Sequence, residues 1–227
     1  MKVAAIILLA GRSERFDSNT PKQFFPINGK PLIYYTIYSF EKVSEIDEIT
    51  LVSRKEDIAK VQNIVKEYGF KKVIRVIEGG ETRNESVHNG LKSLSLSNDD
   101  LVLIHDGARP IVPEKVILSV IHALENSDAV TTAIKVEDTI VFSENSHDIN
   151  SFENRDEYFR IQTPQGFRFE TILKAHENID KNATDDAQLV QRLGIKVKLV
   201  DGDKKMNKIT TIEDINALKV LIENEHL

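Results

Sequence analysis

The feature that most constrains the fold is an alternation of short aliphatic runs with segments of helical periodicity. The aliphatic runs are Val3–Leu9, Glu48–Ser53, Lys72–Ile77, Leu101–His105 and Ala129–Val136. The segments with helical spacing between them are Leu32–Lys42, Glu56–Tyr68, Arg83–Ser95 and Glu114–Asn126. Near-continuous Val, Ile and Leu indicate strands covered on both faces. The alternation therefore predicts an α/β fold, with a mainly parallel sheet flanked by helices.

The rhythm changes after Val136, where β-prone pieces surround a polar turn, "SENSHDIN". We expect residues 137–160, here called the arm, to form a β-hairpin that stands off the sheet. A two-stranded ribbon is marginally stable in water, so the arm needs a packing partner, and a second subunit is the natural candidate. The sequence contains no repeat and no Pro/Gly-rich linker, so we expect one domain, 1–227, that includes the arm.

The last third of the chain predicts three more helices and one more strand. Thr211, followed by Asp214, is similar to a capping box that starts the last of these helices. The expected helices are Glu170–Asn178, Asp185–Leu193 and Ile212–Asn224, and the expected strand is Lys196–Val200.

Charge and composition exclude several functional classes. The net charge of -6 argues against a general nucleic-acid or membrane-surface binder. The chain has no cysteine, which excludes disulfides, thiolate metal sites and a cysteine nucleophile. The N-terminal apolar stretch is too short to span a membrane and lacks a convincing small-residue cleavage site, so we expect a cytoplasmic protein.

Polar loops follow the first, third and fourth predicted strands, with the sequences "GRSERF", "GGETR" and "HDGARP". The carboxyl ends of parallel strands meet at one edge of a sheet, and ligands bind there. We therefore expect these three loops to converge on one rim.

The first loop has the chemistry of a polyphosphate site. Gly11 allows backbone N–H groups to approach a phosphate, and Arg12, Arg15 and Lys22 supply positive charge. The alternative is a solvated loop whose arginines pair with its own acidic residues. Neither the P-loop pattern nor the G-x-G-x-x-G fingerprint follows this strand, which counts against an ATPase and a dehydrogenase.

The other two loops carry further candidates. Asp106 could hold Mg²⁺ bridging phosphate oxygens, and Arg109 could clamp a second anionic group. The alternative is an Asp106 that caps a turn and pairs locally with Arg109. We interpret the neighbouring His105 as a hydrogen-bonded structural residue rather than a catalytic one.

In "EGGETRNES", two adjacent glycines permit close approach to a flat base, and Ser86 can hydrogen-bond a base edge. A simpler reading is a turn in which Thr82 is the N-cap and Glu85 completes a capping box, and both readings can hold together. Lys208, in "NKITT", is by itself an ordinary surface lysine.

Seven motifs occur in the order found in the 2-C-methyl-D-erythritol 4-phosphate cytidylyltransferases, to which this sequence is similar over nearly its whole length. The motifs are "LAGRSERF…PKQF", "EGGETR…S", "HDGARP", "VEDTI", "QTPQGF", "TDDA" and "NKITT" followed by "EDI". The resemblance implies a Rossmann-like fold of the nucleotide-diphospho-sugar transferase type and a homodimer that interlocks through the arm. It also implies a Mg²⁺-dependent transfer of CMP from CTP to the alcohol phosphate, which releases pyrophosphate and serves isoprenoid precursor biosynthesis.

The resemblance also assigns roles to individual residues. The residues implied at the reacting phosphate are Arg15, Lys22 and Lys208. Those implied to bind the nucleotide are Leu9, Ala10, Gly11, Gly80, Arg83, Ser86 and Asp106, of which Asp106 also meets the metal. Those implied to bind the alcohol phosphate are Arg109, Thr139, Arg155, Thr163 and Thr184, with Thr139 and Arg155 coming from the partner's arm.

The sequence departs from the family pattern at three positions. Ser13 replaces a glycine and Phe16 a methionine in the first loop, and Glu81 stands where Asp is common. Because serine adopts positive φ less readily than glycine, the first loop takes another path or is stiffer. These changes bear on contacts to the base more than on the reaction.

Two rival functions remain open. One is a cytidylyltransferase for ribitol 5-phosphate, although "TDDA" and the overall spacing look closer to the methylerythritol enzymes. The other is a non-catalytic nucleotide-binding module on the same fold, and the presence of both Lys22 and Lys208 speaks against it. No residue is an obvious general base, so the attacking hydroxyl needs only alignment and desolvation.

Overall fold

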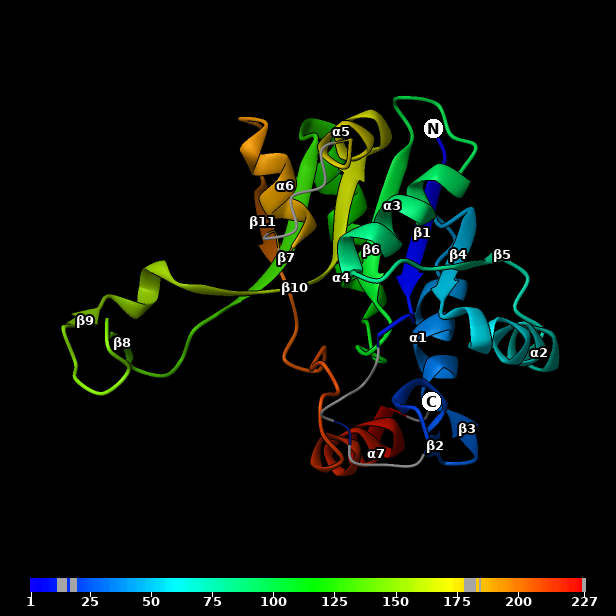
Figure 1. The fold of residues 1–227 in the computed structure, drawn as a ribbon, viewed down its shortest axis with the longest axis horizontal. Helices are drawn as coiled ribbons and strands as arrows, with labels where there is room; N and C mark the ends of the chain where they lie inside the picture. The colour runs from blue at the N-terminus through cyan, green and yellow to red at the C-terminus, as the bar shows by residue number, and fades with distance from the viewer. Residues whose placement is uncertain (12–15, 17–19, 178–182, 184, 226–227) are drawn as a thin grey trace.

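The computed structural model describes residues 1–11, 16, 20–177, 183 and 185–225. Within these residues, seven strands form one sheet in the order β11-β7-β10-β6-β1-β4-β5 (Figure 1). The strands are β1 (Val3–Leu8), β4 (Glu48–Ser53), β5 (Val73–Glu78), β6 (Leu101–Asp106), β7 (Ala129–Lys135), β10 (Phe159–Arg168) and β11 (Lys198–Asp201). The five aliphatic runs are thus strands of one sheet, as predicted.

The sheet is mainly parallel, which confirms the predicted fold class. Within this seven-stranded sheet of the described residues, β10 alone runs antiparallel to its neighbours, β6 and β7. In the parallel part, Leu8 at the end of β1 lies beside Val52 of β4 and Asp106 of β6. This register brings the loops after β1 and β6 to the same edge of the sheet.

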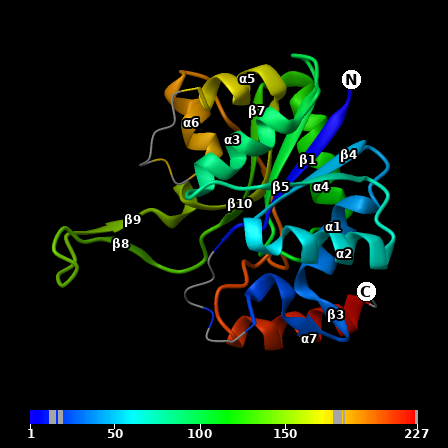
Figure 2. The ribbon, with the colours of Figure 1, turned by 45° about the vertical axis from the view of Figure 1, so that its right-hand side comes forward.

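Helices cover both faces of the sheet. On one face α1 (Leu32–Glu41), α2 (Ile58–Tyr68) and α4 (Glu114–Ala123) pack their apolar side chains on the strands. On the other face lie α3 (Arg83–Ser93), α5 (Phe169–Ala175) and α6 (Asp186–Arg192), and Figure 2 shows these three together on one side. Because both faces are covered, the central strands are buried, and only their ends are open to a ligand.

A third apolar cluster joins the C-terminus to the start of the chain. The last helix, α7 (Glu213–Glu225), packs with the short hairpin β2 (Pro26–Ile27) and β3 (Lys30–Pro31). The Ile209 N–H, in the segment before α7, donates to the carbonyl of Ala108 (2.8 Å), just after β6. The last part of the chain is thereby held beside the carboxyl ends of the sheet.

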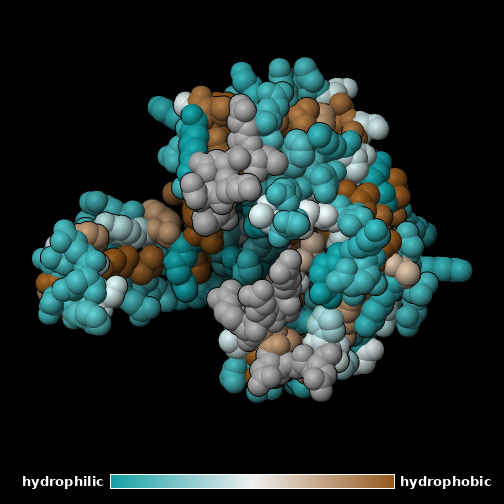
Figure 3. Space-filling view, in the orientation of Figure 1, coloured by the Kyte–Doolittle hydropathy of each residue, from teal (hydrophilic) through white to brown (hydrophobic). Residues whose placement is uncertain are grey.

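The arm contains β8 (Ile140–Phe142) and β9 (Ser151–Glu153), which pair antiparallel as a separate two-stranded sheet. Figures 1 and 2 both show these strands standing away from the body of the molecule. Phe159, near the end of the arm, already belongs to β10 of the main sheet. Apolar side chains lie on the surface of the arm in Figure 3, and Phe152 is 73% exposed.

Short 3-10 turns complete the described elements: η1 (Lys22–Phe24), η2 (Lys55–Asp57), η3 (Leu124–Asn126) and η4 (Arg155–Glu157). The helix predicted over Glu56–Tyr68 therefore begins with a 3-10 turn, and the helix predicted over Glu114–Asn126 ends with one. None of the helices in the described part of the chain is long and apolar enough to cross a membrane.

Candidate active site

A pocket of about 500 Å³ opens at the carboxyl ends of β1 and β6. The described parts of the loops after β1, β5 and β6 line it together with the segment before α7, so these parts of the three loops predicted to converge do meet. The predicted site residues in its wall are Leu9, Ala10, Gly11, Lys22, Gly80, Arg83, Ser86, Asp106 and Lys208.

Asp106 lies in the pocket with three cationic side chains around its carboxylate. Its oxygens are 2.8 Å from Lys208 Nζ and 3.3 Å from Arg83 Nε, and Arg109 Nε is 3.8 Å away. Burial by itself raises the pKa of Asp106, but attraction to Arg83 and Lys208 outweighs it and holds the pKa well below its usual range. The carboxylate is therefore ionised at neutral pH, and the cluster around it carries excess positive charge suited to a polyanion.

Lys22 and Lys208 reach the pocket from opposite ends of the chain. The Lys22 ammonium donates to the carbonyl of Ile209 (2.7 Å), the residue after Lys208. The apolar packing of α7 on the β2–β3 hairpin holds these two segments together. A lysine that looks ordinary in the sequence is thus placed beside the first loop by the fold.

The glycine loop ahead of α3 is shaped by close packing. The side chain of Thr82 caps α3 and Glu85 returns the bond, so the predicted capping box is confirmed. A Cβ on Gly80 would lie 2.2 Å from the Cβ of Glu85, so only glycine fits there. Ser86 accepts from the Gly80 N–H (3.1 Å) and donates to the Thr82 carbonyl (2.9 Å), which fixes the loop against the helix.

A chain of hydrogen bonds holds the loop after β6. Thr163 Oγ1 accepts from the Asp106 N–H (3.0 Å) and lies 3.0 Å from His105 Nδ1. The other ring nitrogen, Nε2, lies 2.9 Å from the Arg109 carbonyl and donates to it, since a carbonyl can only accept. Burial lowers the pKa of His105 to about 4, so the ring is neutral, in agreement with the structural role expected for it.

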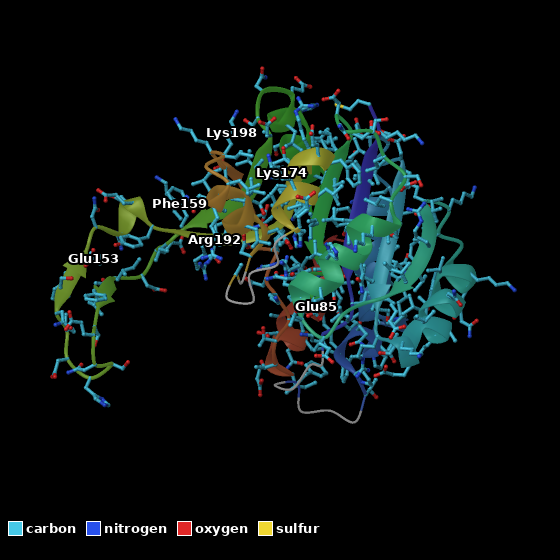
Figure 4. All side chains as sticks on the ribbon, turned by 45° about the horizontal axis from the view of Figure 1, so that its top comes forward. Glu85, Glu153, Phe159, Lys174, Arg192 and Lys198 are labelled. Carbon is cyan, nitrogen blue, oxygen red and sulfur yellow. The ribbon has the colours of Figure 1, made fainter. Side chains whose placement is uncertain are left out.

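Other predicted site residues lie apart from the pocket lining. Arg109 is turned toward the segment before α7, where its Nη1 donates to the Met206 carbonyl (2.7 Å). Thr139 and Arg155 are exposed on the arm, and Arg155 Nη1 donates to the Glu137 carbonyl (2.7 Å). Figure 4 shows Glu153 and Phe159 along the arm, away from Glu85 on α3. Arg15 and Thr184 are outside the described residues.

Sequence reasoning missed several residues of the lining. Gln23 is buried in it and donates to Asp57 (3.2 Å), although nothing but its place after Lys22 marks it in the sequence. Leu32 and Ala108 contribute surface without any chemical signature. Thr210 stands beside Lys208 in "NKITT", so the motif could have indicated it.

Comparison with known proteins gives a consistent result. A family model described as 2-C-methyl-D-erythritol 4-phosphate cytidylyltransferase matches residues 3–224. A protein of that name from Clostridium acetobutylicum is 40% identical over 227 residues, which cover 98% of each chain. One from Caldanaerobacter subterraneus subsp. tengcongensis is 39% identical, over 98% of this chain and 99% of the other.

Solved structures show the same likeness. The crystal structure of 4-diphosphocytidyl-2C-methyl-D-erythritol synthase from Anaerococcus prevotii superposes with a TM-score of 0.86, at 35% identity and over 98% of both chains. The corresponding cytidylyltransferase from Thermus thermophilus gives a TM-score of 0.76 at 31% identity, over 98% of this chain and 100% of the other. With its pocket, its fold and this similarity along its length, the chain belongs to the 2-C-methyl-D-erythritol 4-phosphate cytidylyltransferase family of nucleotidyltransferases.

Proposed function

We propose that this enzyme transfers CMP from CTP to 2-C-methyl-D-erythritol 4-phosphate, releasing pyrophosphate and forming 4-diphosphocytidyl-2-C-methyl-D-erythritol for isoprenoid precursor synthesis. The observation that carries the proposal, beside membership of the family, is that Lys22, Asp106 and Lys208 line one pocket. A triphosphate needs such a concentration of cations in a protein whose net charge is -6.

The reaction is an in-line displacement at the α-phosphorus of CTP. The new P–O bond forms from a phosphate oxygen of the alcohol phosphate, not from the hydroxyl expected from the sequence, because the product is a diphosphate. The bond to pyrophosphate breaks as it forms, so positioning and charge neutralisation do most of the work. In this proposal Lys22 and Lys208, with Arg15, stabilise the charge that develops on the phosphate oxygens. Lys22 would exchange the Ile209 carbonyl for a phosphate oxygen, and Lys208 would exchange the Asp106 carboxylate.

The rest of the lining is proposed to bind the nucleotide. Leu9, Ala10 and Gly11 follow β1 and would lie along it, as backbone of a glycine loop can. The base would sit against the Gly80 loop, which Ser86 holds in place, with Arg83 in the adjacent wall.

At Asp106 this pocket offers a divalent cation one carboxylate ligand from the protein, so substrate phosphates would have to supply others. In the described part of the chain, no three His, Asp or Glu side chains are grouped as a protein-built metal site. Mg²⁺ is commonly held by one or two carboxylates together with substrate phosphates, and Asp106 offers one ionised carboxylate. We therefore place Mg²⁺ on Asp106 and the triphosphate jointly, where it would neutralise phosphate charge.

The alcohol phosphate is proposed to bind at the junction of two subunits. Arg109 and Thr163 lie next to Asp106, whereas Thr139 and Arg155 are exposed on the arm of the same chain. A second copy whose arm crosses this pocket would bring them in, and Thr184 is assigned to the same group. The apolar surface of the arm supports such an interface, so we propose a homodimer of single-domain subunits, 1–227.

Pyrophosphate release from CTP with Mg²⁺ and a panel of alcohol phosphates tests the proposal. We expect release with 2-C-methyl-D-erythritol 4-phosphate and much less with ribitol 5-phosphate. Preference for ribitol 5-phosphate would replace the proposed acceptor, and nucleotide binding without release would favour the non-catalytic module. The cytoplasmic location stays a prediction.

A further inference from the structure

Asp186 and His176 form a fully buried pair that the proposed reaction does not use. Asp186 is the first residue of α6, His176 follows α5, and neither side chain is exposed to solvent. His176 Nε2 lies 3.0 Å from Asp186 Oδ1. Because a carboxylate oxygen can only accept, the proton of this bond is on Nε2.

The second oxygen of Asp186 faces Arg83, the first residue of α3. Arg83 Nη1 is 2.7 Å from Asp186 Oδ2, and Arg83 Nε is 3.3 Å from Asp106 Oδ1. The guanidinium thus lies between one carboxylate inside the protein and another at the pocket. A continuous series of contacts therefore leads from the interior to the site, through His176, Asp186, Arg83 and Asp106.

Charges and hydrogen bonds couple these four side chains to one another. A buried carboxylate is costly unless cations and hydrogen bonds compensate it, and Asp186 has both Arg83 and His176. Without the charge of Asp186, the Arg83 guanidinium would be drawn toward Asp106, where Lys208 and Arg109 already lie. The position of Arg83 in the pocket wall therefore depends on a residue that does not line the pocket.

We propose that the Asp186–His176 pair is a positioning unit that holds the Arg83 guanidinium in the pocket wall and thereby sets the affinity for the nucleotide. The inference rests on the proposed function in so far as Arg83 is assigned there to nucleotide binding. "TDDA" contains Asp186, but the family resemblance assigned a role only to Thr184 in that motif.

A purely structural role makes different predictions. If the pair only joins the end of α5 to α6, its loss lowers the free energy of unfolding and acts independently of Arg83. If it positions Arg83, its loss changes KM for CTP, and the change disappears once the guanidinium is gone.

A double-mutant cycle separates the two roles. We expect Asp186→Asn to raise KM for CTP about tenfold, because it removes the charge that faces Arg83 Nη1, an interaction on the scale of one charge-assisted contact. It should change kcat and KM for the alcohol phosphate less. In an Arg83→Met background, Asp186→Asn should have no further effect on KM for CTP. His176→Gln, which keeps a donor for Asp186, should stay closer to the wild type than His176→Leu.

Asp185→Asn is the matched control. Asp185 caps α6 and accepts from Gln165, and asparagine caps a helix equally well. This variant removes a charge one residue away, which acts on Arg83 only at longer range, and leaves the 2.7 Å pair of Arg83 with Asp186 in place. KM for CTP should therefore change less than in Asp186→Asn. Additive effects of Asp186→Asn and Arg83→Met on KM, or a loss of stability at constant KM, would overturn the inference.

Nuclear magnetic resonance provides a readout that needs no variant of Asp186 to fold and no turnover. In protein labelled with ¹⁵N-arginine, the Arg83 guanidinium, assigned by its loss in Arg83→Lys, should give separate Nη signals because two carboxylates restrain its rotation. A freely rotating Arg83 guanidinium would refute the positioning role. A wild-type protein that shows the restrained signals but releases no pyrophosphate would instead reject the proposed function alone.

Discussion

Each lysine of the pocket already holds an oxygen partner that a phosphate can replace. Lys22 donates to the Ile209 carbonyl, and Lys208 donates to Asp106. These bonds point both ammonium groups at the place where the triphosphate is proposed to lie. The site is thus preorganised before substrate arrives, which is the condition for electrostatic catalysis.

Replacing either lysine by alanine should therefore reduce kcat at least ~100-fold, since an electrostatic donor at a reacting centre contributes about 2.7–4 kcal/mol. Steady-state pyrophosphate release measures this. Lys204→Ala is the matched control, because that side chain is 69% exposed and pairs with Glu137 on the arm. Wild-type turnover in Lys22→Ala or Lys208→Ala would remove that lysine from the reacting centre.

The sequence identified side chains better than it identified their partners. The Thr82 capping box is local, spans four residues and could be predicted from the pattern alone. The pairing of Arg83 with Asp186 joins α3 to α6 and depends on the fold, so no local pattern shows it. Lys208 gained a predicted role only through resemblance, because an isolated lysine has no distinguishing neighbours.

At the scale of elements, the arm is proposed to complete the acceptor site of a second subunit. We expect Arg155→Ala to raise KM for the alcohol phosphate more than KM for CTP, because Arg155 is proposed to reach the acceptor site of the partner. Initial-rate kinetics with each substrate varied in turn will measure both constants. A change confined to KM for CTP would reject this role for the arm.

Asp100 links the starts of β1 and β6 and makes stability depend on pH. Its carboxylate accepts from the N–H groups of Lys2 (2.7 Å) and Ser97 (2.8 Å). These bonds hold the pKa of Asp100 below its ordinary value of 3.8. A lowered pKa means that the stabilisation is complete above the unfolded-state pKa and is lost as pH falls through the folded-state pKa.

Asp100→Asn should therefore lower the free energy of unfolding by about 1.5 kcal/mol at pH 7, with a smaller difference at pH 3. Urea unfolding at the two pH values measures this. Asp99→Asn, at a side chain that is 93% exposed, should change little at either pH. If Asp100→Asn lowered the free energy of unfolding equally at both pH values, the stabilisation would not depend on the ionised carboxylate of Asp100.

Periodicity found the elements whose pattern is regular and missed those whose pattern is not. β10 is a central strand, but "FRIQTPQGFR" combines exposed and buried residues and contains proline and glycine, so no alternation indicated it. The β2–β3 hairpin has two-residue strands, too short for a period. Its Asn28–Gly29 turn has φ values of 47° and 79°, a signal for a tight hairpin that the sequence does contain.

At the scale of the molecule, the order β5-β4-β1 follows from successive strand–helix–strand units, and the sequence predicted those units. β6 follows β5 in the chain but lies on the far side of β1, which the succession of units does not specify. The position of β10 between β6 and β7 requires the chain to return through the sheet after the arm. Packing between segments that are distant in the sequence determines this insertion of β10, and a local sequence pattern does not show such packing.

The dimer proposal is tested by its apolar contacts. Phe142 and Phe152 are 51% and 73% exposed on the arm, and glutamate at both positions should convert the dimer to monomer. Analytical ultracentrifugation measures the mass. Val220→Glu, at a 57% exposed position of α7, is the matched control and should remain dimeric. A wild-type monomer at micromolar concentration would rule out the shared site.

The central claim is that side chains from both ends and the middle of the chain gather around a single triphosphate. A crystal structure of the protein with CTP and Mg²⁺ tests it most directly. We predict the triphosphate in the pocket at the carboxyl ends of β1 and β6, with Lys22 and Lys208 on its phosphate oxygens and the metal on Asp106. A nucleotide bound elsewhere, with both lysines away from phosphate, would contradict it.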